Sequence, residues 1–239
     1  MDKNRIAGAY LQGEEFEKAA NAAEDFQREH PNHPLRFRSI LIQGKSIIKI
    51  GHTREGRKVL LNLAKETPDL RIRNEALMVV GRSLVDEGRF KEADEIFSRI
   101  DKESSLYKKA AKARRYLAGA EEIPLKSPEL AGLLGAILPG AGHLYAERRG
   151  SAVFAFMFTG AFATATMEAF SNEHNELGCG LAAITGLIYA GNIFSAVNVA
   201  HNHNLKQTKA FKERIMDTTR VGMWVGGDGT FMLSLGWCF

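Results

Sequence analysis

LAGLLGAILPGAGHLYA (residues 130–146), GSAVFAFMFTGAFATATM (150–167) and LGCGLAAITGLIYAGNIFSAVNVA (177–200) are three uncharged stretches separated only by short charged loops. A helix needs about 20 apolar residues to cross a hydrocarbon core that is roughly 30 Å thick. The third stretch is long enough, the second is just long enough and the first is marginal. These stretches predict an integral membrane protein, although the mean hydropathy of the whole chain, -0.19, is that of a soluble protein.

Charge divides the chain near residue 128. Residues 1–128 carry 25 basic and 20 acidic side chains, whereas residues 129–239 carry 7 and 8. The pI near 9.0 therefore comes from the polar first half. Its basic and acidic residues are interspersed, which is typical of a solvated surface and not of a nucleic-acid-binding stripe. We expect no nucleic-acid partner.

The first half repeats with a period of 37 residues. The equivalent positions hold Ala7, Gly44 and Gly81; Tyr10, Ile47 and Leu84; Phe16, Thr53 and Phe90; Ala19, Gly56 and Ala93; Ala23, Leu60 and Phe97; and Phe26, Leu63 and Ile100. In the best-preserved copy, residues 81–100, apolar residues recur with helical spacing. Gly88 is expected to end the first helix of that copy, and Pro31 and Pro68 sit where a second helix must stop. Each copy is thus predicted to be a helical hairpin that stacks on its neighbours.

This pattern resembles the tetratricopeptide repeat, which places a small residue in its first helix, an aromatic residue and an alanine early in its second, and a proline at the end. The resemblance covers about residues 4–102, with a spacing slightly longer than the usual 34. The middle copy departs from it at Thr53 and Gly56. A further helix over residues 105–119 is expected to cap the array. The resemblance implies a solenoid with a concave surface for a peptide or partner helix; the alternative is a spacer that packs only on itself.

The residues expected to line the concave surface lie on the first helix of each pair. Helix phase assigns them as Arg36, Gln43, Lys45, Arg73, Arg82 and Asp86. Because this set is mainly basic, it favours an acidic protein or peptide partner.

Pro139 is expected to break the apolar run of residues 130–146, because proline removes a backbone donor. Gly140 and Gly142 free the adjacent backbone. A break inside an apolar run is tolerated where protein or water satisfies the freed groups. The run is therefore either a short half-helix that re-enters the membrane or lies at its surface, or a kinked span. A linker with two prolines, residues 121–129, precedes it.

The turn Pro139-Gly140-Ala141-Gly142-His143-Leu144-Tyr145, followed by a charged turn and an apolar helix, resembles the PGxG(Q/H)xY turn of a group of poorly characterised bacterial membrane proteins. In some of these, tetratricopeptide repeats precede the turn. The second arm of their membrane hairpin often carries a further pattern, matched here by Tyr189, Asn192, Ala196, Ala200, His201 and Asn204. The resemblance covers the chain to about residue 214. It implies a non-enzymatic protein of the bacterial envelope, without catalytic residues.

Two helices over residues 150–170 and 177–200 are predicted to form a transmembrane hairpin within a membrane domain of residues 130–204. Both arms are rich in small residues, which let membrane helices approach closely. Gly160 and Ala163–Thr164 of the first arm could thus meet Gly186, Ala190 and Ser195 of the second. The same small residues would allow a homo-oligomer, and an alternative function follows in which the hairpin passes or senses a small solute.

Basic residues predict the orientation of the hairpin. The turn at Arg148 and Arg149 and the basic residues 205–214 belong on the cytoplasmic side, with the loop of residues 171–176 outside. If residues 130–146 do not cross, the repeats are cytoplasmic, which agrees with an N-terminus that lacks an apolar signal core. If they do cross, the repeats face outward. The family resemblance favours the crossing, and so a periplasmic repeat domain on a multi-pass inner-membrane protein.

The last segment, residues 205–239, is predicted to be a basic tail followed by a short β-hairpin. In residues 221–239, VGMWVGGDGTFMLSLGWCF, a Gly/Asp turn lies between two short runs. Apolar residues alternate along the second run, which gives it one apolar face. We expect this strand pair to lie on the membrane surface or on the helical hairpin.

No sequence motif for phosphate binding, for a catalytic serine or for a zinc protease occurs in the chain. Cys179 and Cys238 lack metal-binding spacing, and His201 and His203 do not face each other on a helix. We therefore expect no enzyme activity, cofactor or metal site. The predicted protein is all-α: a tetratricopeptide-like domain over residues 1–120, anchored in the lipid bilayer, that acts as a scaffold for a protein partner.

Overall fold

The computed structural model describes residues 3–220, which are helical apart from short turns and contain no strand. The helices are α1 (Lys3–Gln12), α2 (Phe16–Glu29), α3 (Arg36–Ile50), α4 (Thr53–Glu66), α5 (Leu70–Asp86), α6 (Phe90–Ser98), α7 (Tyr107–Ala118), α8 (Pro128–Ile137), α9 (Ala141–Tyr145), α10 (Arg149–Ser171) and α11 (Asn175–Thr218). The all-α prediction is confirmed for this part of the chain. The predicted β-hairpin, residues 221–239, lies outside it. Contacts divide the chain into two units, Glu122–Phe211 and the remainder.

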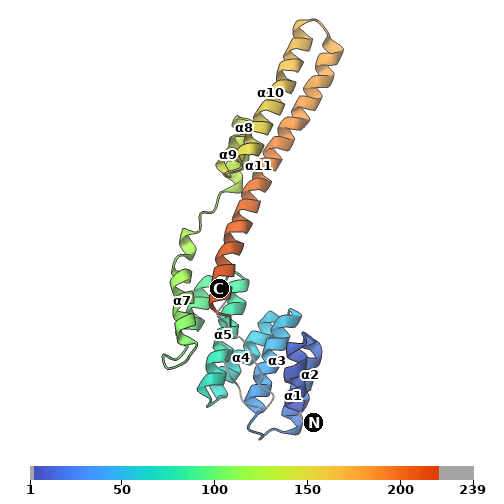
Figure 1. The fold of residues 1–239 in the computed structure, drawn as a ribbon. Coiled ribbons are helices and arrows are strands. Elements are labelled where there is room, and N and C mark those ends of the chain that lie inside the picture. The colour runs from blue at the N-terminus through green and yellow to red at the C-terminus, as the bar shows by residue number, and fades with distance from the viewer. Residues whose placement is uncertain (1–2, 221–239) are drawn as a thin grey trace. The chain divides into compact units, whose positions relative to one another are not determined.

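The first unit is a row of helical hairpins, α1 with α2, α3 with α4 and α5 with α6 (Figure 1). Each helix packs on the next along the chain, and α7 packs on α6. The first helices of the hairpins, α1, α3 and α5, also contact one another in sequence order. They form one layer of the unit, which we call the first-helix layer.

The 37-residue period is visible in the backbone. The second helices of the hairpins begin 37 residues apart, at Phe16, Thr53 and Phe90. Two residues before each start, the backbone is left-handed: φ is 60° at Glu14, 105° at Gly51 and 79° at Gly88. This conformation lets the chain leave the first helix and turn back. Glycine adopts it without strain, whereas glutamate does not.

The period also sets how closely each hairpin closes. Gly44 faces Leu60 and Gly81 faces Phe97, whereas in the first hairpin the equivalent residues, Ala7 and Ala23, belong to one buried cluster. A Cβ at Gly44 would lie 2.5 Å from Leu60 Cδ2, and one at Gly81 would lie 2.4 Å from Phe97 Cε1. Side chains on the second helices are thus accommodated by a missing side chain on the first.

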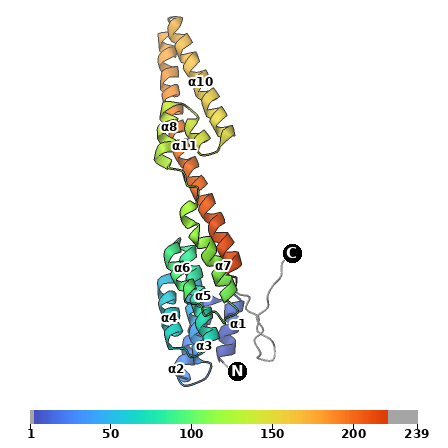
Figure 2. The ribbon, with the colours of Figure 1, turned by 90° about the vertical axis from the view of Figure 1, so that its left-hand side faces the viewer.

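The second unit contains two helices that are long and apolar enough to cross a membrane, α10 and α11, which lie side by side in both views (Figures 1 and 2). In the most apolar stretch of each, only 11% is buried within the protein, so neither is a core helix of a soluble domain. The exposed apolar side chains include Val153, Phe154, Phe156, Met157, Phe158, Met167, Leu177, Ile184, Leu187 and Phe194. The second predicted arm ends at residue 200, but α11 continues to Thr218, because no glycine or proline interrupts residues 192–218.

The run of residues 130–146 is broken where the sequence predicts. Helix α8 ends at Ile137, Gly140 has a φ of 89°, and the short helix α9 follows. The Ser127 hydroxyl caps the start of α8 by accepting a hydrogen bond from Leu130 N at 3.0 Å. With ten residues, α8 is about 15 Å long, half of a hydrocarbon core. The structure therefore has a half-helix here and no kinked span.

The contacts between α10 and α11 differ from the prediction. A Cβ added at Gly160 or at Gly186 would meet nothing within 4 Å, so these two glycines do not mediate close packing between the arms. Instead, Thr166 Oγ1 lies 3.0 Å from Thr185 Oγ1. Each hydroxyl is also within hydrogen-bonding distance of a carbonyl of its own helix, Phe162 O at 2.7 Å and Leu181 O at 2.8 Å, so at most one of the two can donate across to the other helix. A close glycine contact between the arms occurs nearer the loop, since a Cβ at Gly178 of α11 would lie 2.7 Å from Phe170 Cδ1 of α10.

Candidate functional site

Two glycines in the turn between α8 and α10 permit contacts that no other residue would allow. A Cβ at Gly140 would lie 2.3 Å from the Ala152 carbonyl oxygen. A Cβ at Gly142 would lie 2.1 Å from the Ala131 carbonyl oxygen and 2.7 Å from Ala196 Cβ. Because backbone atoms cannot move aside as a side chain does, the turn brings α9 against α8, α10 and α11 only with glycine at both positions.

Two residues of the Tyr-x-x-Asn pattern on α11 donate hydrogen bonds to carbonyls at the end of α8 that lack a helical partner. In an unbroken helix, the Gly135 carbonyl would accept from the N–H of residue 139, which is proline and has none. Asn192 Nδ2 takes that place and donates to Gly135 O at 3.5 Å. Tyr189 Oη donates to the next carbonyl, Ala136 O, at 2.6 Å. Two segments that the sequence marks separately are therefore one structural unit.

Further along α11, the same pattern holds the start of α8. Asn204 Nδ2 donates to Lys126 O at 2.7 Å, and Asn204 Oδ1 accepts from Lys126 N at 2.7 Å. The Tyr145 hydroxyl accepts from Ser127 N at 3.1 Å, and Lys126 Nζ lies 5.2 Å from the centre of the Tyr145 ring. Small residues complete the contact, since Ala200 packs in a buried cluster with Ala131 of α8 and with Ala146, which directly follows α9. His201, by contrast, is exposed.

A pocket of about 480 Å³ lies beside this turn, between α9, α10 and α11. Its polar lining includes His143, Thr159, Asn192 and Ser195, and its walls include Phe154. His143 is 3% exposed, and its Nε2 lies 3.0 Å from Ser195 Oγ. Burial, and to a lesser degree the charge of Arg148, lowers the pKa of the His143 imidazole.

Three buried polar atoms around the pocket have no hydrogen-bond partner: His143 Nδ1, Thr159 Oγ1 and Asn192 Oδ1. Their residues come from three different helices and are 3%, 4% and 7% exposed. Buried polar groups in proteins are nearly always paired, so each unpaired one calls for a ligand, a water molecule or another physical reason. Of the residues that the sequence marks in the turn, only His143 has an unpaired polar side-chain atom here.

The six residues predicted to line a partner groove contact other parts of the array or the end of α11. On α3 and α5, Gln43 accepts a hydrogen bond from Gln27, Lys45 forms an ion pair with Glu75, and Arg73 donates to a backbone carbonyl. Arg36, at the start of α3, lies over the ring of Phe37. All four side chains are half-buried.

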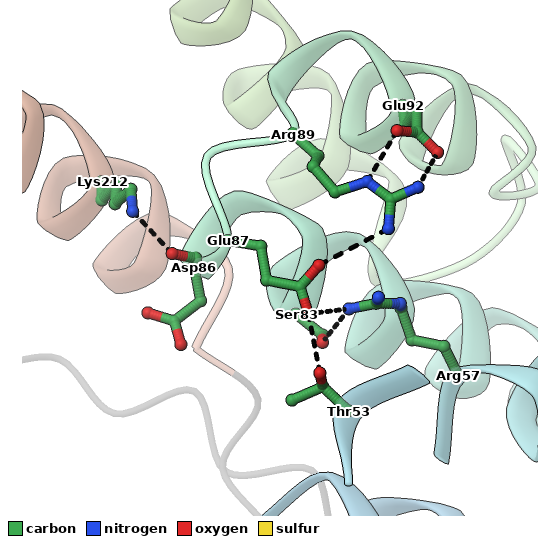
Figure 3. Close-up of polar contacts among 8 residues, drawn as sticks. All are labelled: Thr53, Arg57, Ser83, Asp86, Glu87, Arg89, Glu92 and Lys212. Atoms are coloured by element: carbon green, nitrogen blue, oxygen red, sulfur yellow. Dashed lines mark hydrogen bonds and ion pairs between the residues drawn. The ribbon is translucent and has the colours of Figure 1, made fainter. Parts of the chain in front are cut away.

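The remaining two predicted residues contact the end of α11, which belongs to the same unit as the repeats. Arg82 Nη1 donates to Thr219 O at 3.4 Å. Lys212 Nζ donates to the backbone carbonyl of Asp86 at 2.6 Å, as Figure 3 shows. Ile215 of this segment is fully buried. The last turns of α11 therefore pack against the third hairpin.

Figure 3 also shows a polar network that sequence reasoning missed. Glu87 Oε1 accepts hydrogen bonds from Arg57 Nη1 at 2.6 Å and from Thr53 Oγ1 at 2.7 Å. Arg57 also donates to Ser83 Oγ at 3.0 Å. These bonds, with that from Arg57 foremost, lower the pKa of the Glu87 carboxyl to about 2.

The repeat offers a signal that could have revealed this network. Arg57 and Asp94 occupy equivalent positions, 37 residues apart, on the second helices of consecutive hairpins. Asp94 Oδ1 accepts from Arg114 Nε of α7 at 2.8 Å, just as Arg57 reaches the end of α5. In both copies, this position on the second helix of a hairpin forms an ion pair with the helix that follows it or with the end of that helix. The second helix contributes the basic partner in one copy and the acidic partner in the next, so the equivalence is not evident from the sequence.

Within residues 3–220, no group of three or more His, Cys, Asp or Glu side chains is placed to hold a metal ion. No family model, curated protein or solved structure matches the chain. The fold and the site therefore define its class by themselves. Residues 3–220 are helical throughout apart from turns, and they join stacked helical hairpins to a pair of long, exposed apolar helices.

Proposed function

We propose that the protein is a membrane-anchored scaffold whose tetratricopeptide-like array, residues 3–118, binds an acidic protein partner. The main observation behind the proposal is that one chain combines a charged surface with an extensive apolar surface. The hairpins expose charged side chains, whereas α10 and α11 expose phenylalanine, leucine and methionine along most of their length. An apolar surface of that extent requires a bilayer or another protein to cover it.

Charge distribution supports an acidic partner. The first-helix layer, α1, α3 and α5, carries nine basic and two acidic residues. The second helices, α2, α4 and α6, carry seven basic and nine acidic residues. The two layers thus differ in sign, and a basic surface attracts and orients an acidic segment. The exposed ion pairs elsewhere on the unit contribute little to such binding.

One contact and the length of α8 support our proposal of a cytoplasmic array. Helix α8 is too short to cross, so α10 and α11 make the only two crossings proposed for residues 3–220. Lys212, beyond the second crossing, binds Asp86 of the array, which requires both to lie on the same side. The positive-inside rule assigns Arg148, Arg149 and the basic end of α11 to the cytoplasm.

Single-cysteine labelling tests this orientation. Ser104 and Asn172 are replaced by cysteine, one at a time, in a chain with Cys179 and Cys238 changed to serine. In intact cells, an impermeant thiol reagent should label position 172 and should label position 104 only after the membrane is permeabilised. Labelling of both positions in intact cells would refute the cytoplasmic array and restore the periplasmic one.

Photocrosslinking in cells tests partner binding. A photoreactive amino acid at Arg36, on the first-helix layer, should yield a discrete crosslinked species, and the same residue at Lys65, on α4, should not. The charge reversal Arg73→Glu should remove that species, because it weakens the basic layer, while the matched reversal Lys58→Glu on α4 should leave it. Equal crosslinking from both layers, or insensitivity to Arg73→Glu, would contradict the proposal.

A second candidate function has one observation in its favour. The pocket beside His143 lies within the apolar unit and has unpaired polar atoms. This suits a component that senses a small molecule of the membrane. A deletion of the array would abolish the activity of a scaffold and leave a sensing hairpin intact, which separates the two.

A further inference from the structure

The pocket beside His143 has the composition of a binding site for a molecule that is partly polar. Pockets for small ligands typically measure about 300–1,000 Å³ and combine apolar walls with a small number of placed polar groups. This one measures about 480 Å³. Its polar lining residues come from α9, α10 and α11, and three of them carry a buried, unpaired polar atom. Desolvated polar atoms of this kind gain most from a ligand that supplies the missing hydrogen bonds.

The walls of the pocket point to a lipid with an uncharged head. No Asp, Glu, Lys or Arg is among the lining residues, so a charged group would enter without a counter-charge and at high cost. Phe154 and Phe158 form one wall, with stacked rings whose centres are 5.3 Å apart. Both side chains are also exposed on the outer face of α10, where acyl chains would reach them.

The direction of the hydrogen bonds indicates a ligand whose head group carries a hydrogen-bond donor. Asn192 Nδ2 faces the Gly135 carbonyl, which can only accept, so the amide orientation is fixed and Oδ1 is the unpaired atom. An amide oxygen only accepts, and its ligand must therefore carry an O–H or N–H. The Thr159 hydroxyl can donate or accept in return. A hydroxyl group on the ligand satisfies both, whereas a quinone or an ester, which only accept, leaves Asn192 unpaired.

We propose that this pocket binds an uncharged lipid with a free hydroxyl group on its head, for which diacylglycerol is the simplest example. The hydroxyl donates to Asn192 Oδ1 and accepts from Thr159 or His143, and the acyl chains lie along Phe154 and Phe158. The proposal rests on the membrane insertion of α10 and α11 but not on partner binding by the array.

Competition against a photoactivatable diacylglycerol tests the proposal. The full-length protein is placed in phosphatidylcholine vesicles with the probe, and flotation first shows that the protein is inserted. Unlabelled diacylglycerol should compete for labelling at least about tenfold better than the same lipid with its hydroxyl acetylated, or than a quinone of equal length, since each lacks one hydrogen bond to a buried group. Equal competition by the acetylated lipid, or better competition by the quinone, overturns the proposal.

Two pairs of variants locate the site. Gly191→Leu should fill the pocket and abolish labelling, whereas Gly186→Leu on the same helix should not, because a Cβ at either position meets nothing within 4 Å but only Gly191 lines the pocket. Thr159→Val should weaken labelling about tenfold. Thr164→Val should not, because the Thr164 hydroxyl donates to carbonyls of its own helix.

The outcomes separate this proposal from the proposed function. If the protein floats with the vesicles but no probe labels it in a saturable way, the pocket holds water only and the lipid proposal fails, while the scaffold stands. If Gly191→Leu is labelled like the unchanged protein, the lipid binds elsewhere and the proposal fails as well. If the protein does not float, membrane anchoring itself is wrong.

Discussion

Replacing Glu14 with glycine should stabilise the first helical hairpin. Glu14 has a φ of 60°, whereas the equivalent residues of the next two copies, Gly51 and Gly88, are glycines with φ of 105° and 79°. A non-glycine residue in the left-handed region costs about 1–2 kcal/mol. Glycine also loses more conformational entropy on folding than glutamate does, which reduces the gain in stability by roughly 0.5–1 kcal/mol. Glu14→Gly should therefore stabilise the hairpin by about 1 kcal/mol.

Hydrogen exchange of the amides in residues 3–29, measured by mass spectrometry on the full-length protein, reports this locally. A stabilisation of about 1 kcal/mol should slow the exchange that requires opening of the hairpin by about fivefold. The matched control is Glu17→Gly, which removes the same side chain from the first turn of α2. Glycine there should cost about 1 kcal/mol and accelerate exchange, because it lies within a helix.

The reverse substitution completes the test. Gly51→Ala should cost about 1 kcal/mol, and the cost would be one of backbone strain alone, since a Cβ there meets nothing within 4 Å. If Glu14→Gly accelerated exchange as Glu17→Gly does, residue 14 would not be left-handed. The repetition of backbone conformation every 37 residues would then be refuted for the first hairpin.

Three further perturbations follow from the packing and the charges. Gly81→Ala should destabilise the third hairpin by about 2 kcal/mol, and Phe97→Leu in the same chain should recover part of it, which a double-mutant cycle on thermal unfolding would measure. The pKa of Glu87 is lowered to about 2, so its stabilisation is present above pH 5 and is lost as the pH falls from about 5 to 2. Its side chain is 31% exposed, and with that screening the effect should be about 1 kcal/mol; Glu87→Gln should flatten this part of the stability–pH curve. Gly142→Ala should destabilise the apolar unit by about 3 kcal/mol in detergent, because the added Cβ meets backbone, while Gly180→Ala, with open space around it, should not.

The repeat and its consequences could be predicted from the sequence because they are local. The period of 37 residues placed the starts of α2, α4 and α6, and the left-handed glycine at position 88 ended the preceding helix as expected. Helix periodicity and turn chemistry act over a small number of residues, so they are readable in one dimension. The break at Pro139 belongs to the same class, since the missing N–H is a property of that residue.

Partner assignments within the hairpins were less accessible to sequence reasoning. Helix phase suggested that Arg82 and Asp86 face a groove, but the end of α11 packs there, through contacts more than 120 residues apart in the chain. Likewise, small residues at Gly160 and Gly186 suggested close packing that the structure does not have. The composition of a helix surface indicates which kinds of helix packing are possible, but it does not identify the segment that packs there.

The sequence by itself determined the helices, the repeat, the apolar character of α10 and α11, and the turn at Pro139, because each depends on propensity, periodicity or the chemistry of one residue. Only the tertiary structure decided that the turn and the pattern on α11 form one unit, in which Asn192 replaces the donor that Pro139 lacks. It also decided that His143 meets Ser195, 52 residues away, beside a pocket with unpaired polar atoms. Such contacts depend on where two distant segments meet, and that is fixed by the packing of whole helices and not by any local property of the chain.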